Sequence, residues 1–182
     1  MIAYHLDRCN SLKENSYLSL EPTGIPSTDS LAAIFGFDFV SNWGRQMYEL
    51  YTSSPDPSNI QPYISLQIDM QAENVRRSHF PDSPSRFKSI FAVPKLSDFS
   101  LWRDSLQIDE NASIFEIEYD PQTVVQLDAM FLIGSIGSDP FHQWKSLFRY
   151  WSGEMSLNPL PELLIPLPVF TRKRLRWNEL IF

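Results

Sequence analysis

Prolines divide this chain into short segments, and this limits the folds that it can adopt. Fourteen prolines, against only six glycines, occur in 182 residues. Because proline fixes its own φ and pushes the preceding residue out of the helical region, regular elements end near prolines. Rigid, extended connections are therefore expected. A chain of this length can bury one sizeable core, so we expect a single domain over residues 1–182.

The segments between the prolines predict a mixture of strands and helices. Strands rich in β-branched and aromatic residues are predicted over 2–7, 86–93, 114–119, 124–133 and 163–170. Helices are predicted over 41–51, from a cap at Ser58 to about Arg77, around 99–106, and after Ser138-Asp139-Pro140. This order predicts an α+β domain.

Composition and charge restrict the setting in which the protein works. A hydrophobic fraction of 43% and an aromatic fraction of 14% are typical of folded globular proteins. The lone cysteine, Cys9, excludes an internal disulfide and fits a reducing compartment. Neither a signal peptide nor a membrane-spanning run is present, so we expect a cytoplasmic protein that does not contact a membrane. The net charge of −7 argues against broad binding to nucleic-acid backbones, although basic residues gather at 172–176.

Familiar local motifs of catalysis are missing from the sequence. His5, His79 and His142 are far apart and do not show the spacing of paired metal ligands, so we expect no metal site. The sequence also lacks a phosphate-binding loop, a dinucleotide-binding glycine motif and the Gly-x-Ser-x-Gly elbow of α/β-hydrolases. These classes of enzyme are therefore not indicated.

Three blocks remain: Tyr4-His5-Leu6-Asp7-Arg8, then Ser85 to Ala92, then Pro161 to Pro166. In this order they resemble the three strands that define the ADP-ribosyltransferases. More narrowly, they are similar to an uncharacterised bacterial family with HLDR, PSRF-S-FA, W-GE and E-LL-P-PV blocks. The last block resembles the catalytic-glutamate strand of ADP-ribosyltransferase toxins that act on DNA. The resemblance covers residues 4–170 and implies a split mixed β-sheet with flanking helices, with NAD between the two halves.

The resemblance also implies roles for individual residues. Glu162 would be the catalytic carboxylate, stabilising the oxocarbenium ion that forms when the nicotinamide–ribose bond breaks. His5 or Arg8 would bind the adenine-side ribose or the diphosphate, and Arg86 could also bind the diphosphate through its planar fork. Ser89 would brace the glutamate, and Phe87 or Phe91 would stack on the nicotinamide.

Each of these residues also has a purely structural interpretation. Glu162 could end a strand at the surface, and His5 could be a core histidine with satisfied hydrogen bonds. Arg8 and Arg86 could pair with Asp7, Asp82 or Glu154, while Phe87 and Phe91 could be core residues. Glu154, which follows the predicted helix after Pro140, is a rival for the catalytic carboxylate.

The expected activity is transfer of ADP-ribose from NAD to a nucleic-acid or protein acceptor. The role would be that of a bacterial toxin or phage-defence effector, with a neutralising antitoxin protein as a partner. Many arginine-modifying transferases carry Glu or Gln two residues before the catalytic glutamate; Leu160 occupies that position and counts against arginine as the acceptor. The alternative is a noncatalytic interaction domain that presents the aromatic helices 41–52 and 140–151 to a partner.

Overall fold

The computed structural model describes all residues except 9, 25–35, 107, 109–111, 134–138 and 178–182. Its strands form a four-stranded sheet, a three-stranded sheet and a short two-stranded ribbon, all with antiparallel pairing. The four-stranded sheet has the order β1 (Ile2–Asp7), β6 (Ser113–Glu118), β9 (Val169–Arg176), β2 (Ser16–Leu18). The three-stranded sheet has the order β5 (Ser89–Ala92), β8 (Pro161–Pro166), β7 (Val125–Asp128). The ribbon pairs β3 (Glu21–Pro22) with β4 (Phe39–Val40).

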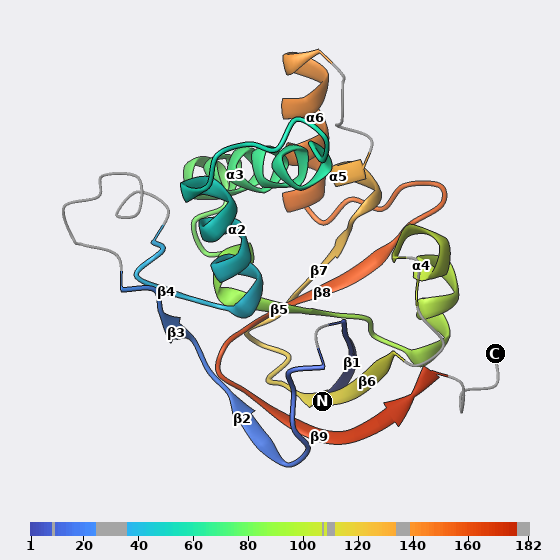
Figure 1. Cartoon of the computed structure of the whole chain (residues 1–182). Helices are drawn as coiled ribbons and strands as arrows, with labels where there is room; N and C mark the ends of the chain where they lie inside the picture. The colour runs from blue at the N-terminus through green and yellow to red at the C-terminus, as the bar shows by residue number, and fades with distance from the viewer. Residues whose placement is uncertain (9, 25–35, 107, 109–111, 134–138, 178–182) are drawn as a thin grey trace.

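The helices gather mainly on one side of the three-stranded sheet. They are α2 (Asn42–Thr52), α3 (Gln61–His79), α4 (Phe99–Leu106), α5 (Met130–Ile133) and α6 (Pro140–Trp151), with 3₁₀ turns η1 (Arg86–Lys88) and η2 (Leu96–Asp98). In Figure 1 the three-stranded sheet lies between the four-stranded sheet and the helices α3, α5 and α6, while α4 flanks the sheets at one end. The protein is therefore a mixed α+β structure, as predicted.

Two buried apolar clusters cover the two faces of the three-stranded sheet. On the helical face, Leu127 and Leu164 pack with Ala72 and Val75 of α3 and Leu147 of α6. The opposite face packs on the four-stranded sheet through a second cluster: Ala3, Ile90, Ala92, Phe115, Ile117, Leu163, Ile165, Leu167 and Val169. The alternation of side chains along β5 and β8 produces this division, because successive residues point to opposite faces.

The predicted helices are present, and their caps differ in one case. Ser41 accepts a hydrogen bond from Gly44 at the start of α2, and Asp139 accepts from Phe141 and His142 at the start of α6. Asp139 thus caps the helix that begins at Pro140, while Ser138 lies outside the described residues. The prediction that Ser58 caps α3 is wrong, because its backbone N–H and its hydroxyl donate to Asp56 instead.

Three predicted strands are wrong in their extent: 86–93, 163–170 and 124–133, the last of which divides into β7 and α5. The segment predicted over 86–93 begins as the 3₁₀ turn η1, because Ser85 caps it and accepts a hydrogen bond from Phe87; the strand itself covers only Ser89–Ala92. The segment predicted over 163–170 is two strands, β8 and β9, separated at the cis peptide bond between Leu167 and Pro168. The chain therefore passes from one sheet to the other at this bend.

The two sheets meet where the edge strands β1 and β5 approach each other. Tyr4 and Val93 form an isolated antiparallel bridge, with N–H to O distances of 3.0 and 2.8 Å. The pairing stops there, and the carbonyl of Phe91 accepts instead from the His5 ring, with Nδ1 2.6 Å from the oxygen. The histidine side chain thus stands where a continuing ladder would place a backbone donor. We refer to this place, defined by Tyr4, His5, Phe91 and Val93, as the β1–β5 seam.

Candidate functional site: a buried charge cluster around Glu162

Glu162 lies in a buried cluster of polar side chains between the three-stranded sheet and the helices. It follows the first residue of β8 and points to the helical face, where its register partner is Leu127. The other members are Asp69 of α3, Arg86 of η1 and Tyr150 of α6. All four residues are at most 6% exposed. We call this group the Glu162 cluster.

Both hydrogen bonds to Glu162 within the described chain reach the same oxygen. Arg86 Nη1 lies 2.6 Å from Oε1, and the Tyr150 hydroxyl also donates to Oε1. Arg86 Nη1 donates to the Tyr150 oxygen as well, so the three groups form a closed triangle. Among the described residues none donates to Oε2 of Glu162. The carboxylate is thus anchored through one oxygen.

Arg86 joins the two carboxylates of the cluster. Its Nε lies 2.6 Å from Asp69 Oδ1, while the indole nitrogen of Trp43 donates to Asp69 Oδ2 at 3.1 Å. The guanidinium carbon lies 4.6 Å from the Phe91 ring centroid and 5.4 Å from that of Tyr150. These rings exclude water from the guanidinium and add cation–π attraction, which strengthens the ion pairs.

Burial shifts the proton equilibria in the cluster. Burial raises the pKa of Asp69, against the lowering effect of Arg86. Burial likewise raises the pKa of Tyr150 well above its usual range, so the hydroxyl keeps its proton and donates to Glu162. Burial alone would lower the pKa of Arg86, but Tyr150, Asp69 and Glu162 raise it well above its ordinary value, so the guanidinium stays charged. Perturbed groups of this kind concentrate at functional sites, although structural ion pairs also produce them.

His5 reaches the cluster only through Phe91, whose carbonyl contacts the His5 ring and whose own ring lies against Arg86. A carbonyl can only accept, so Nδ1 carries the proton and a neutral ring leaves Nε2 as an acceptor. Burial lowers the pKa of His5, and the smaller effects of the Phe91 carbonyl and of Asp7 raise it. The neutral ring is therefore favoured.

The remaining predicted site residues lie outside the Glu162 cluster. Arg8 is exposed just after β1. Phe87 is fully buried and packs with Phe37, Val40, Met47 and Leu66, so it is a core residue. Ser89 does not brace Glu162; its hydroxyl donates to the Ser85 carbonyl at 2.7 Å.

The rival carboxylate and the basic segment are both at the surface. Glu154 pairs with Arg149 at 2.5 Å, and its side chain is 47% exposed. Arg172, Lys173, Arg174 and Arg176 are exposed along β9, where the Arg174 Nε donates to the Ser113 hydroxyl at 2.9 Å. Neither feature adds a residue to the Glu162 cluster.

Sequence reasoning missed Asp69, Tyr150 and Trp43. Arg86 was expected to pair with Asp7, Asp82 or Glu154 if it were structural, but its partners are Asp69 and Glu162. One signal was available: an aspartate next to the apolar stripe of a helix, one residue after Ile68, is an unusual position unless the charge has a partner. Within the described ranges, the acidic, histidine and cysteine side chains form no group of three or more that could hold a metal ion.

Together these features define a mixed α+β protein with two packed antiparallel sheets and a buried ion cluster on the helical face of one of them. The chain belongs to the family described as "Protein of unknown function (DUF2441)", whose match covers residues 3–174. No curated protein matches the chain. None of the described helices is both long and apolar enough to span a bilayer.

Proposed function

We propose that the protein is an NAD-dependent ADP-ribosyltransferase in which Glu162 is the catalytic carboxylate. The observation that carries the proposal is the anchoring of Glu162 through Oε1 alone, by Arg86 and Tyr150. An ionised carboxylate fixed in this way presents its second oxygen as an acceptor. A ribose 2′-hydroxyl is a donor of the right kind, and NAD carries one next to the bond that breaks.

The chemistry follows from the charge that develops on the ribose. The bond between the anomeric carbon and nicotinamide breaks, its electron pair leaves with neutral nicotinamide, and the ribose becomes oxocarbenium-like. A carboxylate at the 2′-hydroxyl stabilises this positive charge in a water-poor site. A nucleophile on the acceptor then bonds to the anomeric carbon and gives up its proton.

The arrangement of the sheets is the second support for the proposal. Among the described residues the edge strands β1 and β5 share one backbone bridge and do not continue as a ladder, a discontinuity that the split sheet of an ADP-ribosyltransferase would also have. His5 stands at that point, with Nε2 directed to no partner among the described residues. The inner faces of the sheets pack on each other, so we place NAD along the β1–β5 seam and over Glu162 rather than between those faces.

Binding in this position requires the covering side chains to move. The Glu162 side chain is only 7% exposed, with Tyr150 and Phe91 on either side of Arg86. In this proposal Phe91 is the ring that moves, because its side chain makes no hydrogen bond to Glu162, whereas Tyr150 is one of the two anchors of the carboxylate. A nucleic acid or a protein side chain remains the proposed acceptor, and a toxin or phage-defence role, with an antitoxin partner, the proposed setting.

The decisive experiment is Glu162→Gln, which removes the charge and retains the shape. Release of nicotinamide from labelled NAD should fall roughly 100-fold to 1,000-fold, as when an electrostatic stabiliser of a transition state is lost. Glu154→Gln is the matched control and should retain activity, since that carboxylate is in an exposed ion pair. Circular dichroism must show that both variants fold.

Full activity of Glu162→Gln would remove Glu162 from the mechanism, and no turnover of NAD by the unmodified protein across candidate acceptors would remove the activity itself. Growth arrest on expression, relieved by Glu162→Gln, would support the toxin role. Relief by Glu154→Gln to the same degree would contradict it.

One observation favours the alternative, a noncatalytic interaction domain. Three aromatic side chains of α6 are exposed: Phe141 at 87%, Trp144 at 48% and Phe148 at 36%. Exposed apolar side chains that are grouped on one surface often mark a site of protein–protein contact. Under this alternative, Phe141→Ser would abolish capture of a partner, while Glu162→Gln would leave capture and growth unchanged.

A further inference from the structure

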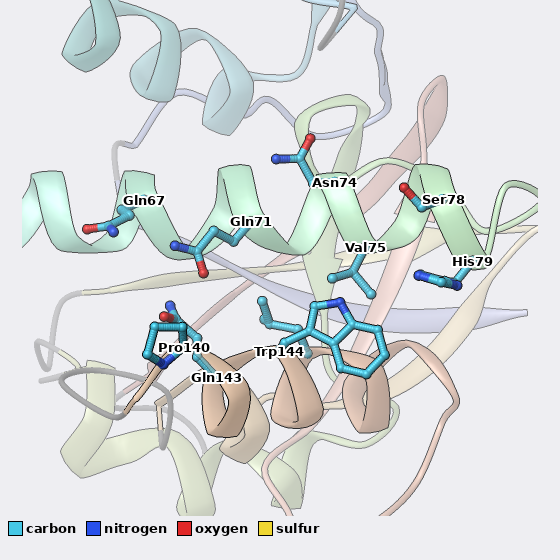
Figure 2. A pocket seen from close by; sticks show the side chains of 10 residues that line it. Gln67, Gln71, Asn74, Val75, Ser78, His79, Pro140, Gln143 and Trp144 are labelled. Carbon is cyan, nitrogen blue, oxygen red and sulfur yellow. The ribbon is translucent and has the colours of Figure 1, made fainter.

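A groove with a mainly apolar lining and several carboxamides runs between α3 and α6, on the side of these helices that faces solvent. Its volume is about 450 Å³, within the range of sites for small organic ligands. Figure 2 shows Gln71 projecting from α3 toward α6 and the Trp144 indole standing between the two helices. Val75 and Leu147, at 5% and 1% exposure, form an apolar floor.

Carboxamides are the main polar groups of this groove. They belong to Gln67, Gln71 and Asn74 of α3 and to Gln143 of α6. None of these four side chains has a hydrogen-bond partner among the described residues, and each offers two donors and an acceptor. Gln67 and Asn74 are exposed, whereas Gln71 and Gln143 are half-buried. The lining contains no Asp, Glu, Lys or Arg. The groove is therefore suited to a neutral ligand with several hydrogen-bonding atoms.

Aromatic rings border the same groove. Trp144 lies edge-on to His79, with centroids 5.7 Å apart and an interplanar angle of 83°. On its other side Trp144 contacts Phe148 at 5.3 Å and 32°. The indole remains 48% exposed, so much of its face is open for stacking. A flat ligand can stack on this face while its edge meets the carboxamides.

From these features we propose that the α3–α6 groove binds an adenine base. A carboxamide can accept from the N6 amino group of adenine and donate to N7 at the same time, and an indole face stacks well on a purine. No Lys or Arg lines the groove and the net charge is −7, and both argue against a ligand recognised mainly through its phosphates. The adenine can belong to free adenosine, to a dinucleotide such as NAD, or to an unpaired base of a nucleic acid.

Titration calorimetry with three probes separates these sources: adenosine, NAD and a short oligo-dA. Adenosine should bind with one-to-one stoichiometry, and inosine should bind on the order of ten-fold more weakly, because its O6 and N7 are both acceptors. Tighter binding of oligo-dA than of adenosine identifies a nucleic acid as the source. Tighter binding of NAD identifies the dinucleotide only if Trp144→Ala weakens it, because NAD bound along the β1–β5 seam would not depend on Trp144.

Two variants and one control test the location. Gln71→Leu removes a carboxamide at nearly constant shape, and Trp144→Ala removes the stacking face; each should weaken adenosine binding on the order of ten-fold or more. Phe141→Ala is the control, since Phe141 is on the same helix, 87% exposed and outside the groove lining. It should bind adenosine like the unmodified protein.

The proposal is overturned if adenosine does not bind up to its solubility limit, or if folded Gln71→Leu and Trp144→Ala bind it unchanged. Binding of a peptide, but of no adenine compound, would also overturn it. The same titrations in Glu162→Gln keep this result separate from the proposed transfer activity. Adenosine binding there should be unchanged, whether or not the protein turns over NAD.

Discussion

The charges of the Glu162 cluster are unequal in number. Two carboxylates, Asp69 and Glu162, face one guanidinium, that of Arg86, and all are buried. Burial raises the pKa of Asp69, because it disfavours a second buried negative charge beside that of Glu162, and Arg86 opposes this effect. Tyr150 offsets part of the charge on Glu162 by donating to it. The cluster therefore depends on Arg86 more than on either acid.

Removing Arg86 should destabilise the protein strongly. Arg86→Met leaves both acids buried without a cation, and breaking a buried pair in this way costs about 3–5 kcal/mol. The free energy of unfolding in urea, measured near neutral pH, would show the loss. Arg149→Met, which breaks the exposed pair with Glu154, should change it far less. Equal losses of unfolding free energy in the two variants would mean that the buried ion pairs of Arg86 stabilise the protein no more than the exposed pair does.

His5 should make the stability of the protein sensitive to mild acid. Burial lowers the pKa of His5 in the folded state below the ordinary value of 6.5, so the unfolded chain binds more protons in the interval between the two values. The stability that the neutral His5 ring contributes is fully present above its ordinary pKa of 6.5. This stability is lost as the pH falls from that value through the lower pKa of the folded state.

The comparison uses His5→Asn, whose amide nitrogen can still donate to the Phe91 carbonyl. Between about pH 7 and about pH 5, the unfolding free energy of the unmodified protein should fall relative to that of the variant. Parallel pH profiles for the two proteins would show that His5 does not titrate in this range.

The sequence alone indicated two of the four residues of the Glu162 cluster. Glu162 and Arg86 stand in the blocks that resemble ADP-ribosyltransferases, whereas Asp69 and Tyr150 lie within helices whose pattern predicts packing only. The hydrogen bonds of Arg86 join residues that are 17, 64 and 76 positions apart, and such contacts depend on tertiary structure, which local periodicity does not specify.

Among the elements, α2 shows how a small residue allows a close approach. A Cβ added at Gly44 would lie 2.3 Å from the Phe87 carbonyl oxygen and 2.8 Å from the Val40 Cβ. The same Phe87 carbonyl accepts from the backbone and the hydroxyl of Ser41. The first turn of α2 is thus fixed directly against η1, the turn that carries Arg86.

Gly44→Ala should therefore destabilise the protein, although alanine is normally the better residue within a helix. We expect a loss of about 1–3 kcal/mol from overpacking, measured by thermal unfolding. Glu49→Ala, at an exposed position of the same helix, should change stability by less than about 0.5 kcal/mol. A neutral or stabilising Gly44→Ala would show that η1 moves away without cost.

The elements could be predicted where a local signal was strong. The apolar stripe of α2, the cap and stripe of α6 and the alternation of β6 are such signals, and these elements occur as predicted. The start of β5 could not be predicted in this way, because Arg-Phe-Lys has strand-like residues but the Ser85 cap favours a turn. The predicted strand 124–133 likewise divides into β7 and the short helix α5, where Asp128 accepts from Met130.

The whole molecule is united by the apolar cluster between its sheets. Ile117 of β6 is fully buried there, against residues of β5, β8 and β9. The other face of the three-stranded sheet packs on the helices, so each layer depends on the next. A further buried cluster on the four-stranded sheet, with Leu6 and Ile114, also contains Val93, which follows β5, so it too links the two sheets.

We therefore expect unfolding in a single step. Urea curves followed by far-ultraviolet circular dichroism and by tryptophan fluorescence should coincide for the unmodified protein. In Ile117→Ala both curves should move together, with a loss of about 2–5 kcal/mol from the cavity. Two separate transitions, or a shift in only one curve, would indicate independent units.

The order of the strands has a consequence for synthesis. Each sheet receives a strand that comes late in the chain: β8 lies in the middle of one sheet, and β9 lies between β6 and β2 in the other. While these strands are still inside the ribosome, β5 cannot pair with β7, and the sheet partner of β2 is missing. Contacts between such distant segments are slow to form. A chain that stops before β8 thus lacks the middle strand of one sheet, the β9 strand of the other, and Glu162.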